Sequence, residues 1–526
     1  MTGGQAILAS IAQGGVDTIF GIPGVHTAGI YDALLDHPEL RHVMCRHEQG
    51  AGFMADGYAR VSGRIACALT ITGPGVTNIV TSLGEAQAES SPVLHVCTTL
   101  EASMIGKDVG FLHELRDQSG LLGSVVGWHR RVRRVADIPV AVADALHNMR
   151  AGRPGPASIE IPIDIVDSTA DVTIPRMSPP EALRPDPEAL RQAVKLLVAA
   201  ANPVILAGGG LIAAGASDAL VEVAEKLSAP VFTTVNGKGA IPEDHPLSLG
   251  CRWRGDPSFD ALLSAADLVL VIGSRLSARN TDNWQLPLPR SVIQIDIDSR
   301  IIGRHYPASK GIHAHAKPTL EAIAASIPTR PQQLHPGRLE EVEGLRRSTR
   351  AASDDPAVGI LGAVRDALPR DGTLVNDMTS VCYQGPRHFL TYEPRTFLFP
   401  TYFGTLGFSL PAAIGAMVAR PEKKVVCLVG DGGFLFTAQE LSTALALKQP
   451  LPIVVLNDGG YMELEVAFRR SHNRTIDCSL VTPDFVKFAR SFGASGTRVG
   501  EPSELRRAIR AAFRRKRPTV IEYTLA

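Results

Sequence analysis

Two acidic residues in the last third of the chain each follow an apolar run and are flanked by glycine. KVVCLVG (424–430) leads directly into Asp431 of GDGG, and LPIVVLN (451–457) leads into Asp458 of NDGGY. Carboxylates at these places could hold a hard cation such as Mg²⁺, and the glycines would let the backbone approach a phosphate group. Asp and Gly are also common in tight turns, so either segment alone is explained equally well as a turn with a capping acid.

The apolar runs before these acids indicate strands of a parallel sheet. Short apolar runs alternate with longer helix-like stretches along the chain, and they lack the period of two expected for a sheet with one face in water. In open parallel sheets, ligands bind at the carboxyl ends of the strands. Asp431 and Asp458 would therefore face one crevice, where they predict a metal-bridged diphosphate.

The candidate strands form three groups, separated by two proline-rich stretches that we interpret as linkers, 173–190 and 327–341. We therefore predict an α/β fold of three doubly wound domains with mainly parallel sheets, spanning 1–172, 190–326 and 350–526. The candidate strands are 16–22, 41–46, 65–71, 92–97 and 157–162, then 202–208, 229–235, 267–273 and 291–297, and finally 373–377, 424–430, 451–457 and 518–524.

The bulk composition excludes several classes of protein. A chain of 526 residues is too long for one core, and its 45% apolar content is ordinary for a globular protein. The 53 basic and 53 acidic side chains cancel, which argues against nucleic acid or a membrane surface as partner, and we interpret the basic run 129–134 as a solvated face. We expect no signal peptide and no membrane span, which needs ~18 apolar residues. Seven cysteines without CxxC spacing indicate reduced core thiols and a cytoplasmic protein.

Taken together, the two acidic segments resemble the signature of thiamine diphosphate enzymes, in the group of acetolactate synthase, pyruvate oxidase and benzoylformate decarboxylase. The resemblance implies that Mg²⁺ is held by Asp431, Asp458 and the carbonyl oxygen of Gly460. The family usually has Asn in place of Asp458, and because Asn457 is adjacent, the assignment of this ligand stays open. The other residues that the resemblance assigns to cofactor binding in these segments are Gly430, Gly432, Gly433 and Tyr461.

The resemblance extends over the whole chain. HEQGAGFMADGYAR (47–60) looks like the pyrimidine-binding helix of the family, so Glu48 would bond the aminopyrimidine N1′ and promote formation of the thiazolium ylid. TGPGVTN (72–78) also fits the first domain of the family. A lone Glu at a helix start is usually a capping residue, and only the length of the match reverses that interpretation.

Two further segments resemble cofactor-contacting parts of the family. In YFGTLGFSLPAAIGA (402–416), Gly404 would offer its carbonyl to the 4′-amino group and Leu406 would separate the two cofactor rings. NDMTS (376–380), with Thr379, would line the diphosphate and the substrate.

The resemblance also implies the roles of the three domains, which are pyrimidine-binding, central and diphosphate-binding in chain order. Because Glu48 and Asp431 lie on different domains that meet across a subunit interface in this family, it implies a homodimer or homotetramer with active sites at the interface. The central segments GGG (208–210) and VIGSRLS (271–277) contact FAD, ADP or nothing in relatives, and three glycines alone do not predict FAD.

The resemblance implies decarboxylation of a 2-keto acid through an ylid and an enamine, which is then protonated or joined to a second carbonyl. His26, in GIPGVHT, matches a proton-transferring His of benzaldehyde lyase-like members. Gln118, in HELRDQSG, matches a pocket Gln, and His113 is close by in sequence, although the twin-His motif of pyruvate decarboxylases is absent. We predict catalytic roles for Glu48, His26 and Gln118, and substrate contact for His26, His113 and Gln118.

The substrate is predicted from acids at pocket positions. Glu463 follows the metal loop where members of the family place a pocket side chain, and Asp377 could add a second acid. Such acids favour a cationic tail, because a guanidinium binds carboxylates in two places. The resulting hypothesis is an enzyme like 5-guanidino-2-oxopentanoate decarboxylase. Glu463 could instead point to solvent together with Glu465.

Two alternative functions remain open from the sequence. The first is a carboligase of acetolactate synthase or benzaldehyde lyase type. The second is a non-catalytic, nucleotide-binding regulatory protein, which predicts loss of Glu48 or of the GDG loop, and both of these are present. A nicotinamide dehydrogenase would need a GxGxxG motif after a strand, and we find no convincing example.

Overall fold

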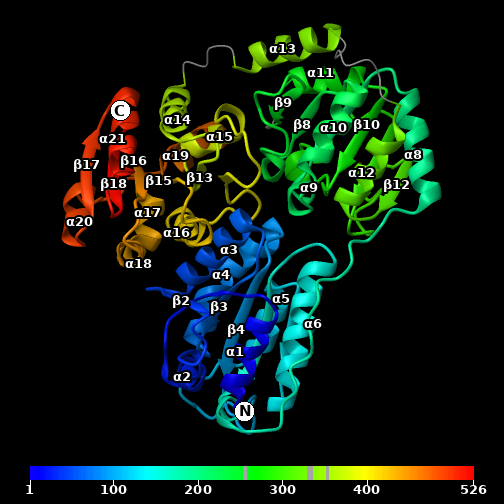
Figure 1. Cartoon of the computed structure of the whole chain (residues 1–526). Coiled ribbons are helices and arrows are strands. Elements are labelled where there is room, and N and C mark those ends of the chain that lie inside the picture. Colours follow the sequence, from blue (N-terminus) through cyan, green and yellow to red (C-terminus); the bar gives the residue numbers. More distant parts are fainter. Residues whose placement is uncertain (253–256, 329–335, 351–354, 526) are drawn as a thin grey trace. The chain divides into compact units, whose positions relative to one another are not determined.

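The computed structural model describes residues 1–252, 257–328, 336–350 and 355–525 (Figure 1). It contains three sheets flanked by helices, each with six described strands. The strand pairings found within each sheet are parallel. The α/β class and the three domains with parallel sheets are therefore confirmed.

The first sheet has the strand order β2-β1-β3-β4-β6-β5. Its strands are β1 (Thr18–Gly21), β2 (Arg41–Met44), β3 (Ala66–Thr70), β4 (Val93–Thr99), β5 (Trp128–Arg131) and β6 (Ala157–Pro162). The helices of this part are α1 (Gly3–Gln13), α2 (Ala28–Leu34), α3 (Glu48–Ser62), α4 (Pro74–Glu89), α5 (Gln118–Val125), α6 (Ile138–Ala151) and α7 (Ile163–Asp167), with the 3₁₀ helices η1 (Val25–Thr27) and η2 (Val135–Asp137).

The second sheet has the order β12-β11-β10-β7-β8-β9. Its strands are β7 (Pro203–Ala207), β8 (Val231–Thr233), β9 (Ser248–Cys251), β10 (Leu268–Ile272), β11 (Ser291–Asp296) and β12 (Lys310–His313). The helices are α8 (Pro187–Ala199), α9 (Gly209–Ala213), α10 (Ser217–Leu227), α11 (Pro257–Ala265), α12 (Ala316–Ser326) and α13 (Pro336–Arg350), with η3 (Val235–Gly237) and η4 (Ala278–Asn280).

The third sheet has the order β14-β13-β15-β16-β18-β17. Its strands are β13 (Thr373–Asn376), β14 (Phe397–Leu398), β15 (Val425–Gly430), β16 (Pro452–Asn457), β17 (Ser495–Val499) and β18 (Thr519–Thr524). The helices are α14 (Pro356–Ala367), α15 (Ser380–His388), α16 (Ser409–Ala419), α17 (Asp431–Thr437), α18 (Leu441–Ala446), α19 (Met462–His472), α20 (Phe485–Ser491) and α21 (Pro502–Ala512), with η5 (Ala438–Glu440).

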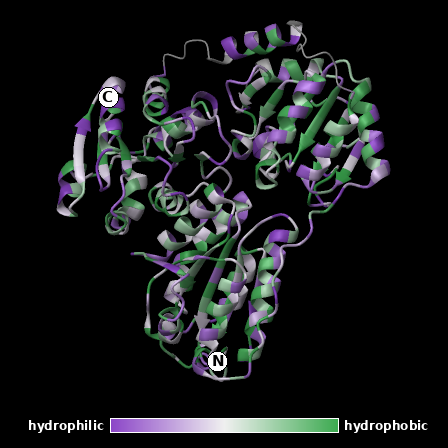
Figure 2. Ribbon diagram, in the orientation of Figure 1, coloured by the Kyte–Doolittle hydropathy of each residue, from purple (hydrophilic) through white to green (hydrophobic). Residues whose placement is uncertain are grey.

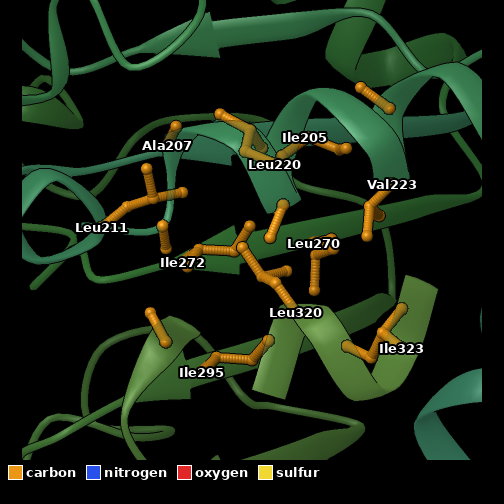
Figure 3. Packing of buried hydrophobic residues seen from close by; sticks show 14 of the residues in the cluster. Ile205, Ala207, Leu211, Leu220, Val223, Leu270, Ile272, Ile295, Leu320 and Ile323 are labelled. Carbon is orange, nitrogen blue, oxygen red and sulfur yellow. The ribbon is translucent and has the colours of Figure 1, made fainter. Parts of the chain in front are cut away.

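The interior strands are apolar because helices cover both of their faces. All residues of β3, β4, β7 and β10 are buried, and the strands in the middle of the sheets stand out as hydrophobic in Figure 2. In the central domain, Ile205, Leu270 and Ile272 of the sheet pack with Leu220 and Leu320 of the helices (Figure 3). Each such side chain contributes about 1.5–3 kcal/mol on burial, so these layers hold the strand ends in place.

Each predicted strand is present, but five further strands were missed: β5, β9, β12, β14 and β17. All five lie at sheet edges. The basic run 129–134 was predicted to be a solvated face, and this was wrong for His129 and Arg131. These two residues belong to β5 and contact the buried carboxylate of Glu160, at 3.1 and 3.0 Å.

The first predicted linker contains no helix or strand over residues 173–186, and α8 begins at Pro187. The second, 327–341, was wrong from Pro336 onward, where α13 begins; residues 329–335 lie outside the described part. By contacts, the chain divides into two compact units, one of residues 1–180, 374–379 and 400–526, the other of 181–373 and 380–399. The predicted domain boundaries stay a prediction.

Two smaller predictions concern cysteines and membranes. All seven cysteines are free, and all except Cys478 are buried, which confirms core thiols. Within the described ranges, no helix has both the length and the apolar character that crossing a membrane requires.

Candidate active site

The two acidic strand ends lie on neighbouring strands, since β15 pairs with β16. Asp431 is 1% exposed; its Oδ1 accepts a hydrogen bond from the Gly432 amide at 2.8 Å, while its Oδ2 is buried without a hydrogen-bond partner. Burial raises the pKa of Asp431, and burial together with the charge of Asp431 raises the pKa of Asp458 to about 6. An unpaired buried carboxylate oxygen close to a second acid fits a hard divalent cation.

The side-chain amide of Asn457 is already hydrogen-bonded to other groups of the chain. Its Nδ2 donates to Glu522 Oε1 at 2.9 Å, and its Oδ1 accepts from the Gly459 amide at 3.2 Å. These bonds brace the turn after β16 from both ends of the amide. The structure therefore favours Asp458 over Asn457 as the side-chain ligand, although the ligand set stays a prediction.

The turn after β16 is anchored by a second chain segment and by the GDG loop. Gly460 forms an isolated bridge with Ser479, and the Tyr461 amide donates to the Cys478 carbonyl at 2.9 Å. A Cβ atom at Gly432 would lie only 2.5 Å from the Tyr461 ring, so the ring packs directly onto the GDG backbone. Gly432 and Tyr461 thus adjoin one another, as their shared assignment to a cofactor site requires.

The segment after β13 connects the GDG loop to the Gly404–Gly407 loop. Asp377 is fully buried, and its carboxylate accepts hydrogen bonds from the amides of Met378, Gly407 and Ser409 at 2.9, 3.2 and 2.9 Å. Its pKa is raised by burial. These bonds indicate a positioning role for Asp377, and the predicted substrate contact stays untested.

Two residues of this segment approach glycines of the neighbouring loops. Thr379 is 9% exposed and lies against Gly430, where an added Cβ would be 3.3 Å from its side chain. Gly404 has φ +78°, a left-handed conformation that favours glycine, and the Met378 methyl group lies 3.5 Å from where its Cβ would be. Gly404 and Leu406 are both partly exposed, so a ligand could reach them.

Glu48 is oriented by a residue that the sequence did not single out. It occupies the first turn of α3 and is partly exposed; its Oε2 accepts a hydrogen bond from Asn78 Nδ2 at 2.9 Å. Its Oε1 lies 3.6 Å from the position of a Cβ at Gly75. Asn78 stands thirty residues away on α4, so no local spacing could have revealed this pair.

His26 and His113 come together from distant parts of the chain. Their Nδ1 atoms are 3.3 Å apart, and their rings meet edge to face at 5.0 Å. Burial and the neighbouring His113 lower the pKa of His26. A hydrogen bond between them requires one Nδ1 to donate and the other to accept, so the two neutral rings would adopt opposite tautomers.

Gln118 is buried at the start of α5, and its amide is occupied. Its Oε1 accepts from the Thr72 hydroxyl and the Gly73 amide at 2.9 and 3.0 Å, and its Nε2 donates to the Thr98 carbonyl and to Glu160 at 2.9 and 3.2 Å. These bonds favour a positioning role. A cavity of about 130 Å³ opens beside Gln118, lined also by Thr72 and Arg131.

The segment 72–78, which comprises the turn before α4 and the first residues of that helix, is the centre of the first-domain group. Gly73 has φ +62° and lies so close to the His113 carbonyl that a Cβ would overlap it. The segment 72–78 thus contacts Gln118 and His113 through Gly73, and Glu48 through Asn78. Among the described residues, the predicted site falls into this group and a second one built around 376–380, and each group is held together by its own central segment.

Glu463 lies on α19, none of whose residues is buried in this chain. Glu463 is exposed, and its charge is one cause of the raised pKa of Asp458, which places it near the metal loop. Glu465, two residues on, pairs with Arg469 at 2.8 Å. The two acids therefore differ in their surroundings, and the substrate role of Glu463 stays a prediction.

The central GGG turn is filled by its own chain. A Cβ at Gly208 would overlap the Gly273 carbonyl, and one at Gly209 or Gly210 would lie 2.8 Å from Asn236 or Gly273. Close backbone packing therefore accounts for the three glycines, and they give no support of their own for FAD.

Three family profiles match the chain along its length. "Thiamine pyrophosphate enzyme, N-terminal TPP binding domain" matches residues 1–121, "Thiamine pyrophosphate enzyme, central domain" matches 190–323, and "Thiamine pyrophosphate enzyme, C-terminal TPP binding domain" matches 377–523. Each match begins and ends within or close to one of the three sheets.

Curated relatives cover nearly the whole chain. It is 38% identical to "Probable 2-ketoarginine decarboxylase AruI" of Pseudomonas aeruginosa, over 99% of this chain and 94% of that protein. It is 32% identical to "Probable acetolactate synthase large subunit" of Methanococcus aeolicus, over 100% and 92%. It is 34% identical to "Acetolactate synthase" of Mycobacterium bovis, over 95% and 84%.

Proposed function

The chain belongs to the thiamine pyrophosphate enzyme family, and we propose that within it the chain is a Mg²⁺-dependent 2-keto acid decarboxylase. Thiamine pyrophosphate is another name for the thiamine diphosphate that the resemblance implies, and the resemblance is confirmed. The observation that carries the proposal is the buried, unpartnered Oδ2 of Asp431 beside Asp458. The regulatory alternative predicted loss of Glu48 or of the GDG loop, and membership of an enzyme family argues further against it.

Thiamine diphosphate, when bound, supplies the carbon nucleophile and takes up the electrons released by decarboxylation. Asp431, Asp458 and the Gly460 carbonyl would hold the metal that joins it to the protein. Two carboxylates compensate the charge of a divalent cation, which accounts for the cost of burying them. The Tyr461 ring and the glycines of the GDG loop would bound the diphosphate.

Glu48 would hold a proton at N1′ of the aminopyrimidine. Asn78 fixes Oε2, so Oε1 is the oxygen that faces a ligand. A side chain held at one oxygen loses little further freedom on binding. The Gly404 carbonyl and the Leu406 side chain would hold the aminopyrimidine ring in the orientation in which its N1′ atom faces Glu48.

The His26–His113 pair would move a proton at the reacting carbon. The two Nδ1 atoms lie within hydrogen-bond distance, and the lowered pKa of His26 leaves its ring unprotonated, and so able to accept a proton, near neutral pH. Gln118 would position the pair through Gly73, whose backbone packs against His113.

For the substrate, we propose a 2-keto acid with a guanidino tail, such as 5-guanidino-2-oxopentanoate, also called 2-ketoarginine. Two independent observations support it: the exposed Glu463 near the metal loop, and 38% identity to a relative named for this activity. A carboxylate can bind a guanidinium through two hydrogen bonds, which an uncharged keto acid cannot offer.

We propose a homodimer or homotetramer in the cytoplasm as the working assembly. The residues of the site carry exposed apolar neighbours, among them Val25 (90%), Phe403 (55%) and Leu464 (52%). Exposed apolar side chains around a polar site favour a subunit interface there. The oligomeric state follows from sedimentation of the purified protein.

The first test is calorimetric titration of apo-protein with thiamine diphosphate, with and without Mg²⁺. Binding that requires the metal supports the proposal; absence of binding in both titrations contradicts it. Decarboxylation of 2-ketoarginine, pyruvate and benzoylformate is then compared by kcat/KM. A preference for either uncharged acid contradicts the proposed substrate.

Glu463→Gln tests the substrate class directly. We expect kcat/KM for 2-ketoarginine to fall by about 10- to 100-fold, in line with the ~1.5–3 kcal/mol of a hydrogen bond to a charged group. Glu465→Gln is the matched control, because it removes the same charge two residues further along α19. The Glu465 side chain pairs with Arg469. Equal losses in both variants would point to long-range charge rather than contact.

A carboligase of acetolactate synthase type is the second candidate. The relatives from Methanococcus aeolicus and Mycobacterium bovis carry that name at 32% and 34% identity. Acetolactate formed from pyruvate, measured under the same conditions, distinguishes the two. Ligation faster than aldehyde release would favour the carboligase.

A further inference from the structure

Buried carboxylates of one domain hold the loop that leads into Gly404 and Leu406 of the other. Glu85 and Glu89 stand on α4 of the first domain and are 0% and 8% exposed. The Thr405 hydroxyl donates to Glu85 Oε2 at 2.9 Å, and the Tyr402 amide donates to Glu89 Oε1 at 2.8 Å. Two residues of α4 therefore hold this loop by hydrogen bonds on either side of Gly404.

A buried carboxylate also crosses in the opposite direction. Glu440, at the end of η5 and 0% exposed, accepts hydrogen bonds from the amides of Arg46 and His47, each at 3.0 Å, and from the Thr443 hydroxyl at 2.7 Å. These amides directly precede Glu48. Gly50 makes room for the contact, because a Cβ there would overlap Glu440.

The helices that carry these residues pack at backbone distance. A Cβ at Gly57 of α3 would overlap the Ala412 carbonyl of α16, and one at Gly415 of α16 would overlap the Met54 carbonyl of α3. The two helices belong to the same compact unit. A carboxylate on one side therefore acts on a fixed target on the other.

We propose that Glu85, Glu89 and Glu440 form a reciprocal carboxylate clasp, in which each domain positions the ligand-contacting segment of the other within one chain. The carboxylate clasp rests on the proposed cofactor contacts of Glu48, Gly404 and Leu406. Its members touch backbone and hydroxyl groups of those segments, so they are positioning residues. Loosening either half displaces one wall of the site.

The α4 half of the clasp places Glu85 among other charged groups. Around Glu85 stand Asp56 and Arg60 of α3, Glu89 of α4 itself and the Thr405 hydroxyl, with the Phe408 ring at the start of α16 under Arg60 at 4.9 Å. Three acids thus share one guanidinium. Burial above all, and then the charge of Glu89, raise the pKa of Glu85 well above its usual range.

The sign of the resulting pH dependence follows from that direction. A carboxyl group with a raised folded-state pKa contributes most stability below its ordinary pKa, and this contribution is lost as pH rises through the raised value. The thermal midpoint of the apo-protein should therefore fall as pH is raised from about 4.5, the ordinary pKa, to about 8, the raised pKa of Glu85. Glu85→Gln should remove this fall, because the amide stays neutral and its oxygen still accepts from Thr405.

Asp56→Asn is the matched variant inside the cluster. Asp56 accepts hydrogen bonds from Arg60 at 2.7 and 2.9 Å, whereas the 402–405 loop donates to Glu85 and Glu89. Losing this acid lowers the pKa of Glu85, so the fall should move to lower pH while the loop contacts remain. A fall that keeps its position in Asp56→Asn, or that persists in Glu85→Gln, would overturn the assignment to Glu85.

Hydrogen exchange of the apo-protein tests both halves without any ligand. Glu85→Ala and Glu89→Ala should speed exchange of the Thr405 and Tyr402 amides, and Glu440→Ala that of Arg46 and His47. Glu440→Gln should restore protection at 46–47, since the amide oxygen still accepts. Glu243→Gln, another buried acid but in the other compact unit, should leave all four amides unchanged.

The closing experiment adds cofactor titration and a kinetic split. Glu85→Ala and Glu440→Ala should weaken thiamine diphosphate binding by about 10- to 100-fold, as the loss of a supporting partner does. Glu440→Ala should also lower kcat with KM for the keto acid unchanged. Unchanged exchange and unchanged cofactor affinity in folded variants would overturn the clasp. A wild-type protein that binds no cofactor would instead overturn the proposed function.

Discussion

Two glycine-rich turns in this chain look alike in sequence and behave differently in the structure. GGG (208–210) follows β7 and opens α9; GDGG (430–433) follows β15 and opens α17. In the first, the positions of the missing Cβ atoms are filled by Gly273 and Asn236. In the second, a buried carboxylate oxygen of Asp431 has no hydrogen-bond partner.

The two turns differ in their polar groups and not in how their glycines pack. In both turns the backbone lies close to other atoms of the chain, as the missing side chain of glycine permits. At 208–210 the neighbouring atoms belong to Gly273 and Asn236. At 430–433 too, an added Cβ would meet the chain itself, at Thr379, Tyr461 or Asp377. At 430–433 the Oδ2 atom of Asp431 is buried without a hydrogen-bond partner, a cost that a bound cation would offset. Substitutions in the two turns should therefore affect different properties.

Asp431→Ala should have the largest effect and should act on binding. Losing one partner of a buried charged contact costs about 2–5 kcal/mol, which is roughly 30- to 5,000-fold in cofactor affinity. The apo-protein should keep or raise its thermal midpoint, because an unpaired buried acid is removed. Calorimetry and thermal unfolding check the two parts. A less stable apo-protein with unchanged affinity would assign Asp431 to the turn.

Gly208→Ala should have a moderate effect and should act on stability alone. The new methyl group would overlap the Gly273 carbonyl, and such crowding costs about 1–3 kcal/mol. The thermal midpoint should fall while the affinity for thiamine diphosphate stays that of the wild type. Gly362→Ala in α14 is the control: no atom lies within 4 Å, so stability should be unchanged or rise by about 0.5–1 kcal/mol. A loss of affinity in Gly208→Ala would erase the distinction between the turns.

Asp458→Asn should have the smallest effect and restores the residue that the family usually has. An amide oxygen can still bind the metal, so the affinity should stay within about 10-fold. The pKa of Asp458 is raised to about 6, so its contribution to apo-protein stability is full in acid and is lost as pH rises through that value. When the thermal midpoint is measured from about pH 4 to 8, the variant should not show this loss of stability. A pH dependence equal to that of the wild type would show that Asp458 is not its source.

The sequence predicted the interior of each sheet and missed most of its edges. A strand covered on both faces must be apolar throughout, as in β10 (LVLVI), and such a run is visible without a structure. An edge strand needs no such run: β5 reads WHRR, and β17 reads SGTRV. Their residues are only half-buried, so their composition resembles that of loops.

The candidate site divides in a similar way. Asp431 and Asp458 could be predicted because each stands at the end of a visible strand. Asn78, Glu85 and Glu440 could not, since each acts on a residue or loop far away in the chain. The polar contacts of Asp377 and Gln118 were also hidden, because a sequence shows which side chain is present and not which groups already occupy it.

The polar edge strands have a consequence for how the protein behaves at high concentration. The outer rim of an edge strand exposes unpaired amides and carbonyls, which can recruit a strand from another molecule and start aggregation. Four of the six described edges carry cationic or imidazole side chains: Arg41 and His42 on β2, His129, Arg130 and Arg131 on β5, Lys310 and His313 on β12, and Arg498 on β17. Arg131 and Arg498 pair with acids of their own chain, so these edges oppose docking through the cost of desolvating charged side chains rather than through like charges. The polar residues that hide β5, β12 and β17 from a search for apolar runs thus also protect those edges from pairing with another molecule.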